Sequence, residues 1–154
     1  MSTIFADNFK NTSGGDPVNI NEVKTDKITG KTTAGSITVQ GEGTATTNLQ
    51  QGLCKVWVQM QTESGHIIED SLNVTSLTDP GAGKTTVNIN NNMANGSYSW
   101  ATGVCNGGGF NDTSTINVDN TELPTTSVFK FYAFMNSGLN DAKLACVNIH
   151  GDLA

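Results

Sequence analysis

The sequence predicts a mainly β protein, in which an antiparallel β-sandwich follows an extended N-terminal arm and one short helix. Charged residues make up only 14% of the 154 residues, so Thr, Asn, Ser and Gly supply most of the polar surface, as in short strands joined by turns. The apolar residues before position 46 are scattered in patches too small to close a core. After residue 66, alternating segments recur roughly every 10–15 residues, which favours a sandwich. We therefore expect an arm over residues 1–45 and a domain over residues 46–154.

One helix is expected at about residues 46–56. The apolar residues there have the spacing of one helix face, namely Leu49, Leu53, Val56 and Met60. From Lys55 onward the apolar residues also alternate as in a strand, so the helix should end near Lys55 and lead directly into a strand. We expect the stripe formed by Leu49, Leu53 and Val56 to contact other copies of the chain.

The remaining segments favour strands. Val128–Met135 is apolar on both faces, which is typical of a central strand or an interface. Asn95-Gly96 is a strong signal for a hairpin turn. The segments expected to form strands are Ile67–Leu77, Thr85–Asn90, Ser97–Val104, Thr113–Asn120, Val128–Met135 and Ala142–Ile149.

The segment DPGAGKTTVNI, residues 79–89, contains the GKT of a phosphate-binding loop. That motif, G-x-x-x-x-G-K-[ST], needs a first glycine five positions before the glycine that precedes the lysine, and a helix after the motif. Here Thr78 occupies the glycine position, and the residues after Thr85 alternate as in a strand. We interpret residues 78–83 as a turn between two antiparallel strands, in which proline and glycine permit the required backbone angles, and we expect Lys84 and Thr85 to begin the second strand.

Charge and cysteine content argue against several classes of function. The net charge is −6, all eight basic residues are lysine and none is arginine, which disfavours nucleic-acid binding. The N-terminus lacks the apolar core of a signal peptide, and no apolar run reaches membrane-spanning length. Three widely spaced cysteines predict small buried residues in a protein made in a reducing cytoplasm, although a bond between Cys105 and Cys146 stays open.

No catalytic, cofactor or metal site emerges from the sequence. His66 lies close to Glu69 and Asp70, but we interpret this group as a solvated strand edge, because neighbours on a strand face opposite sides. A glycine-rich loop follows Cys105 and combines amides, a carboxylate and one aromatic ring. Loops of this kind contact neutral sugars through stacking and hydrogen bonds, which makes this loop the candidate for host contact through Asn106, Phe110, Asn111 and Asp112.

Several segments resemble small structural proteins of tailed bacteriophages, especially marine ones, of the tail-fibre or virion-appendage type. These segments are STIFADNFKNTSGGDPVNI at residues 2–20, KTDKITGKTTAGSITV at 24–39, LQQGLCKVWVQM at 49–60 and HGDLA at 150–154. In such proteins a T-x-x-LQQGL-x-K-x-W segment links an arm to a β-rich domain, which carries a pattern like that of Asp70–Met93. This chain departs from the pattern at Pro80 and at Cys54, where alanine is common.

The resemblance implies a non-enzymatic virion protein that is made in the host cytoplasm and needs no cofactor. The expected partners are further copies of itself, as a homotrimer, other phage tail or capsid proteins, and a glycan on the host surface. Nucleic-acid binding and membrane insertion are not expected. The alternatives are a capsid decoration or head-fibre protein, a carbohydrate-binding β domain and, with least support, a small hydrolase.

Overall fold

The computed structural model describes residues 22–30, 37–40, 44–105, 114–118, 122–135 and 138–154. Apart from one four-residue helix, the regular elements are strands. They are β1 (Thr38–Gln40), β2 (Thr46–Asn48), α1 (Leu49–Gly52), β3 (Cys54–Gln61), β4 (Ile67–Leu72), β5 (Val74–Gly81), β6 (Lys84–Ile89), β7 (Ser99–Cys105), β8 (Ser114–Val118), β9 (Val128–Met135), β10 (Gly138–Leu139) and β11 (Leu144–His150).

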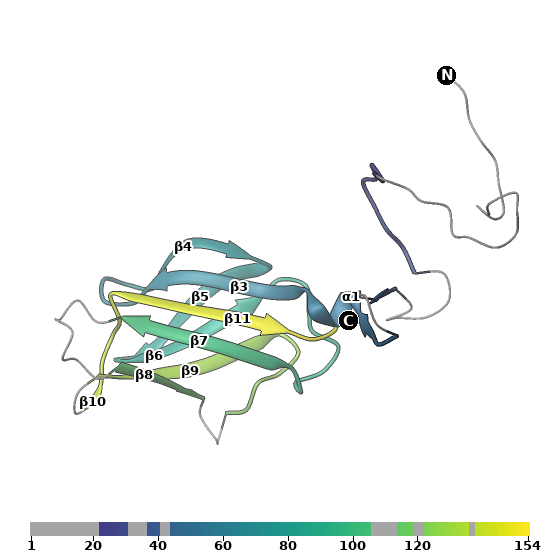
Figure 1. Cartoon of the computed structure of the whole chain (residues 1–154). Coiled ribbons are helices and arrows are strands. Elements are labelled where there is room, and N and C mark those ends of the chain that lie inside the picture. Colours follow the sequence, from purple (N-terminus) through teal and green to yellow (C-terminus); the bar gives the residue numbers. More distant parts are fainter. Residues whose placement is uncertain (1–21, 31–36, 41–43, 106–113, 119–121, 136–137) are drawn as a thin grey trace, which may run out of the picture.

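Two antiparallel sheets pack face to face, as the sequence predicted (Figure 1). The first sheet has the strand order β4-β3-β11-β7. The second has the order β10-β9-β6-β5, and β8 also pairs with β9. The chain changes sheet between β4 and β5 and again between β6 and β7, so each sheet contains strands from distant parts of the sequence.

The core fills the space between the two sheets. Alternate residues of β3, β6, β9 and β11 point inward, as expected for strands with one buried face. The largest fully buried side chains are Phe129, Met60, Met93, Ile149, Val56, Val58, Val87 and Val147. The prediction that Val128–Met135 is a central strand is confirmed, because β9 pairs with β6 on one side and with β8 on the other.

The predicted helix is much shorter than expected. It covers only Leu49–Gly52, and the Asn48 side chain caps it by accepting from the backbone N–H groups of Gln50 and Gln51 at 2.8 and 3.2 Å. Leu53 is already extended, and β3 begins at Cys54. The prediction of a helix to about residue 56 is therefore wrong. The two-residue period of Val56, Val58 and Met60 prevails because it buries all three side chains between the sheets.

Two predicted connections are also corrected. The single strand predicted over Ile67–Leu77 is broken at Asn73, whose φ of 60° turns the chain from one sheet to the other. The Asn73 side chain holds this turn through hydrogen bonds to the backbone N–H and C=O of Asn91 at 2.6 and 3.0 Å. Asn95-Gly96 does not join a hairpin, since β6 and β7 belong to different sheets. Gly96 instead permits close approach, because a Cβ there would lie 2.4 Å from the Pro124 carbonyl oxygen.

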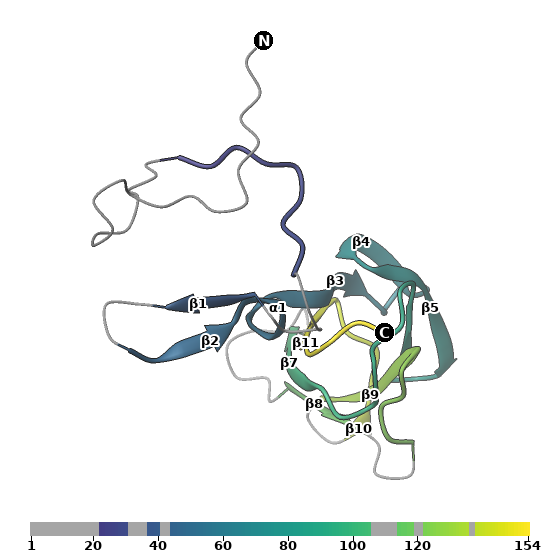
Figure 2. The ribbon, with the colours of Figure 1, turned by 90° about the vertical axis from the view of Figure 1, so that its right-hand side faces the viewer.

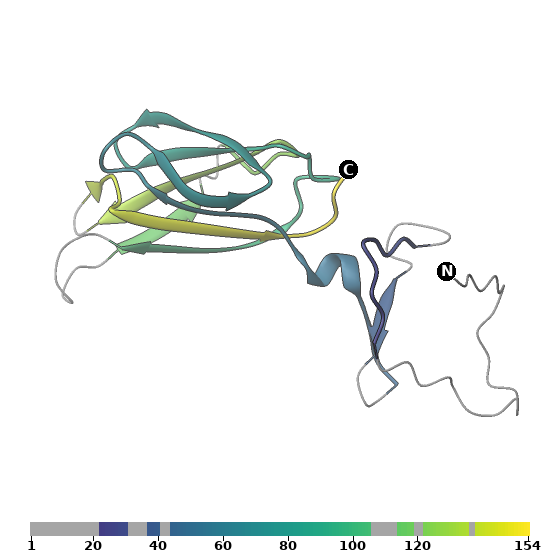
Figure 3. The same ribbon diagram turned by 90° about the horizontal axis from the view of Figure 1, so that it is seen from above.

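The described part of the N-terminal arm lies beside the sandwich rather than between its sheets (Figures 1 and 2). Residues 22–30 are exposed along their length. The hairpin formed by β1 and β2 spans the predicted boundary at residue 45. Seen from above, α1 lies between this hairpin and the sandwich (Figure 3). The helix therefore joins the arm to β3.

The three cysteines, all within described segments, form no disulfide with one another. Cys54 and Cys146 are partly buried and Cys105 is exposed. The prediction that they are buried apolar residues is therefore wrong. Cys105 and Cys146 both occupy outward-facing positions of the first sheet, where Cys105 pairs with Leu144 and Cys146 with Gly103.

Tyr98 gives the sandwich a predictable response to alkaline pH. Its hydroxyl lies 3.2 Å from the carbonyl oxygens of Thr125 and Val128, and burial raises its pKa from 10.0 to about 12. The stability contributed by the protonated hydroxyl is complete below pH 10 and is lost as the pH rises through about 12. We expect the free energy of unfolding to fall by roughly 1 kcal/mol more in the wild type than in Tyr98→Phe between pH 9 and pH 11. Urea titrations at the two pH values measure this difference, and parallel losses would show that Tyr98 is not the group responsible.

Candidate functional site

The residues predicted to form an oligomer interface do not share one helix face. Leu49 lies in α1 and is partly buried, whereas Leu53 follows the helix and is 54% exposed. Val56 lies in β3 and is 0% exposed, because it packs in the core of its own chain. Of the three residues, Leu53 therefore presents the most apolar surface to a partner.

The predicted host-contact loop lies outside the described residues, and this applies to Asn106, Phe110, Asn111 and Asp112. Its flanking strands are β7 and β8, which belong to different sheets. The loop prediction therefore stays a prediction.

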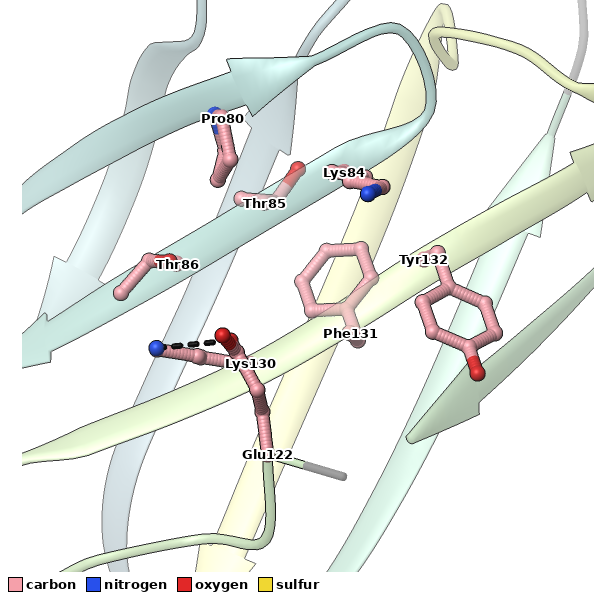
Figure 4. A pocket seen from close by; sticks show the side chains of 8 residues that line it. All are labelled: Pro80, Lys84, Thr85, Thr86, Glu122, Lys130, Phe131 and Tyr132. Carbon is pink, nitrogen blue, oxygen red and sulfur yellow. Dashed lines mark ion pairs between the residues drawn. The ribbon is translucent and has the colours of Figure 1, made fainter. Parts of the chain in front are cut away.

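A pocket lies on the outer face of the second sheet, where neighbouring strands bring polar and aromatic side chains together (Figure 4). Lys84 of β6 pairs directly with Tyr132 of β9, and Thr86 pairs with Lys130. Because residues two apart on a strand share a face, these four side chains form one outward-facing block. Pro80 and Glu122 also line the cavity, which has a volume of about 100 Å³, and the buried Thr85 and Phe131 complete its lining. Thr86 is only 8% exposed. We call the cavity lined by these eight residues the outer-face pocket.

Charge in the outer-face pocket is unevenly balanced. The Lys130 ammonium lies 2.7 Å from a Glu122 carboxylate oxygen, a close ion pair between partly exposed side chains. Lys84 is exposed and, within the described residues, no carboxylate lies within ion-pair distance of it. Two lysines and one glutamate give the pocket a net charge of +1, on a chain whose net charge is −6.

An aromatic surface continues from the pocket along β9. The rings of Tyr132 and Phe134 lie 5.6 Å apart in an edge-to-face arrangement, and Phe134 is 38% exposed. Both rings occupy outward-facing positions, while the intervening Ala133 points into the core. The sequence contained one signal for this site, namely a lysine at position 130 inside an otherwise apolar strand.

The GKT segment forms no phosphate-binding loop. Lys84 and Thr85 begin β6 as expected, so a strand follows and no helix N-terminus does. The connection is shorter than the expected turn over residues 78–83, because β5 continues to Gly81. Gly83 has a φ of 69° and is buried, with its N–H donating to an Asp141 carboxylate oxygen at 2.7 Å. Lys84 instead lines the outer-face pocket.

His66 lies in an environment that the sequence did not predict. Its side chain is only 4% exposed, so the interpretation as part of a solvated edge is wrong for His66. It holds for Glu69 and Asp70, which are exposed on the edge strand β4. Its Nε2 lies 2.9 Å from both the Lys84 carbonyl oxygen and Thr85 Oγ1, and its Nδ1 lies 3.7 Å from an Asp79 carboxylate oxygen. The imidazole therefore connects the start of β4 in one sheet with the β5–β6 hairpin of the other.

The set Thr85, His66 and Asp79 resembles a nucleophile, a base and an acid, but the geometry opposes that chemistry. The carbonyl oxygen of Lys84 can only accept, so in the tautomer that makes this hydrogen bond Nε2 carries the proton and takes none from Thr85. Thr85 is also only 2% exposed, which keeps a substrate away from its hydroxyl. We assign this set a structural role in holding the sheets together.

Comparison of the chain with protein-family models, curated proteins and solved structures finds no match. Across the described segments, no helix is long and apolar enough to cross a membrane, and no group of three or more His, Cys, Asp or Glu side chains is arranged to hold a metal ion. Among the described residues, the outer-face pocket brings two lysines, a glutamate and a tyrosine together at one cavity, and it is the candidate site.

Proposed function

We propose that the chain is a non-enzymatic structural protein of a bacteriophage virion, of the tail-fibre or appendage type. In this proposal the N-terminal arm docks onto the virion and onto sister chains, and the β-sandwich faces outward toward the host. The resemblance of residues 2–20, 24–39 and 49–60 to such proteins supports this division of roles, because α1 and β3 lie where the arm meets the sandwich.

The observation that carries the proposal is the exposure of apolar side chains outside the sandwich. Val23 and Ile28 of the arm are 69% and 64% exposed, Val39 of β1 is 44% exposed and Leu53 is 54% exposed. The sandwich also exposes apolar side chains, such as Leu123 at 68%, but none of the arm's described residues belongs to the hydrophobic core. Apolar side chains that a chain does not bury in its own core can mark an interface with another chain. Sister chains and virion proteins would cover these residues after assembly.

The Leu53→Asp variant tests the assembly. We expect the full chain to sediment at about three times its mass of 16.2 kDa and the variant at the mass of one chain. A carboxylate that is buried in an interface loses its hydration, and equivalent carboxylates around a symmetry axis repel one another. Analytical ultracentrifugation measures both masses.

Leu123→Asp provides the matched control, because Leu123 is 68% exposed and lies on the loop between β8 and β9. It should sediment as the wild type does. A monomeric wild type at micromolar concentration, or equal masses for wild type and Leu53→Asp, would contradict the proposed interface.

The position on the virion requires a separate experiment. A cryo-EM map of particles that carry a bulky tag on this chain should show the added density on the tail. Density on the capsid would favour the alternative of a head-fibre or decoration protein, and particles without the tag would contradict a virion role.

A further inference from the structure

We propose that the outer-face pocket binds a sugar unit that carries a single carboxylate, such as a uronic acid within a surface polysaccharide. This inference deepens the host contact of the proposed function and rests on that function only for the source of the glycan. The binding groups would be Lys84, Lys130 and Tyr132, which lie on adjacent strands of one rigid sheet.

The dimensions of the site suit one sugar ring. Residues directly opposite on antiparallel strands have Cβ atoms about 5 Å apart. Residues two apart on a strand are about 7 Å apart. The block formed by Lys84, Tyr132, Thr86 and Lys130 thus has about the footprint of a pyranose. Both strands are internal to the sheet, so the groups are held in place before a ligand arrives.

Charge selects the class of ligand. The net charge of +1 matches a single carboxylate, whereas a phosphate monoester would carry about −1.5 to −2. Lys84 is the lysine available to a ligand, since Glu122 already neutralises Lys130. An acidic ligand would otherwise be repelled by a chain of net charge −6, so a positive pocket has a specific effect against that background.

The aromatic side chains favour a sugar over a simple anion. Tyr132 contributes a partly exposed ring beside Lys84, and Phe134 extends the apolar surface along the strand. Such a ring can stack against the C–H groups of a pyranose, while the hydroxyl of Tyr132 exchanges hydrogen bonds with sugar hydroxyls. Neutral sugars were expected at the loop after Cys105, whereas Lys84 suits this pocket to an acidic sugar, because one lysine suffices as a point charge for one carboxylate.

Titration of the ¹⁵N-labelled full chain with trigalacturonic acid tests the proposal by NMR. We expect amide shifts concentrated around Lys84, Lys130 and Tyr132, and no binding of maltotriose, a neutral sugar of the same length. Lys84→Ala should bind about tenfold more weakly, because it removes a charge-assisted contact. Lys143→Ala makes the same change in charge at an exposed lysine outside the pocket and should bind as the wild type does.

Three further variants test the stacking on Tyr132 and the local charge at Lys130 separately from general electrostatic attraction. Tyr132→Phe keeps the ring and should retain most of the affinity, whereas Tyr132→Ala should lose it. Glu122→Gln releases Lys130 from its ion pair and should bind trigalacturonic acid several-fold more tightly. A purely structural role for Glu122 would not produce this gain.

Three outcomes would overturn the proposal. The first is that maltotriose binds as tightly as trigalacturonic acid. The second is that Lys84→Ala and Lys143→Ala lose the same amount of affinity for trigalacturonic acid. The third is that dextran sulfate binds as tightly as trigalacturonic acid and that this binding disappears in 0.5 M salt. A failed titration would leave the sedimentation mass and the position on the virion, which are measured separately, unaffected. If the chain bound trigalacturonic acid but sedimented as a monomer and was absent from virus particles, only the proposed virion role would be overturned.

Discussion

The Gly83→Ala variant is expected to lose about 2–5 kcal/mol of unfolding free energy. Alanine at a φ of 69° costs about 1–2 kcal/mol by itself. The added Cβ would also lie 2.5 Å from the Asn140 backbone nitrogen and 2.9 Å from the Ala133 carbonyl oxygen. These are backbone atoms that cannot rotate away, so the segment around β10 must move, at a further cost of about 1–3 kcal/mol. Urea denaturation of both proteins measures the difference.

Gly52→Ala is the control for this prediction. A Cβ at Gly52 has nothing within 4 Å, and the residue lies at the end of α1. Alanine there should change stability by no more than about 1 kcal/mol, in the stabilising direction. If Gly83→Ala denatured at the wild-type urea concentration, the close packing of Gly83 against β9 and β10 would be wrong.

Phe129→Ala is expected to cost about 3–5 kcal/mol and to lower the melting temperature by roughly 10 °C. Phe129 is 0% exposed, and its ring centroid lies 5.6 Å from that of Trp100 and 6.3 Å from that of Phe131. Its removal leaves a cavity between the sheets that these large rings cannot fill. Differential scanning calorimetry gives the shift.

Phe134→Ala removes the same atoms from the outer face of the same strand. Phe134 is 38% exposed, so we expect a loss of only about 1 kcal/mol, mostly from its contact with Tyr132. Equal melting temperatures for Phe129→Ala and Phe134→Ala would contradict the assignment of inward and outward faces on β9.

The strands that the sequence predicted best are those in which polar and apolar residues alternate strictly. Thr85–Asn90 was expected to form a strand, and the alternate residues Thr85, Val87 and Ile89 are buried in β6. The helix was overestimated because Leu49, Leu53, Val56 and Met60 fit a helical period while the last two also fit a strand. A local pattern cannot decide between these periods, since the choice depends on the second sheet that covers Val56.

The candidate site was harder to predict than the fold. Lys84 and Tyr132 meet only through the register between β6 and β9, which is set by tertiary packing. The turn at Asn73 was missed for a similar reason, because its positive φ is stabilised by hydrogen bonds to the distant Asn91. No pattern in the sequence around His66 indicated that the β5–β6 hairpin would cover its ring.

The pairing of β3 with β11 has a consequence for biosynthesis. These are the first and last strands of the sandwich, yet they are neighbours in the middle of one sheet. While the chain is being translated, β3 leaves the ribosome before the other strands of the sandwich, but its partner is the last of these strands to emerge. Contacts so distant in sequence form slowly. Nascent chains should therefore stay sensitive to protease until β11 has been released, and the sandwich should close only once this strand is available.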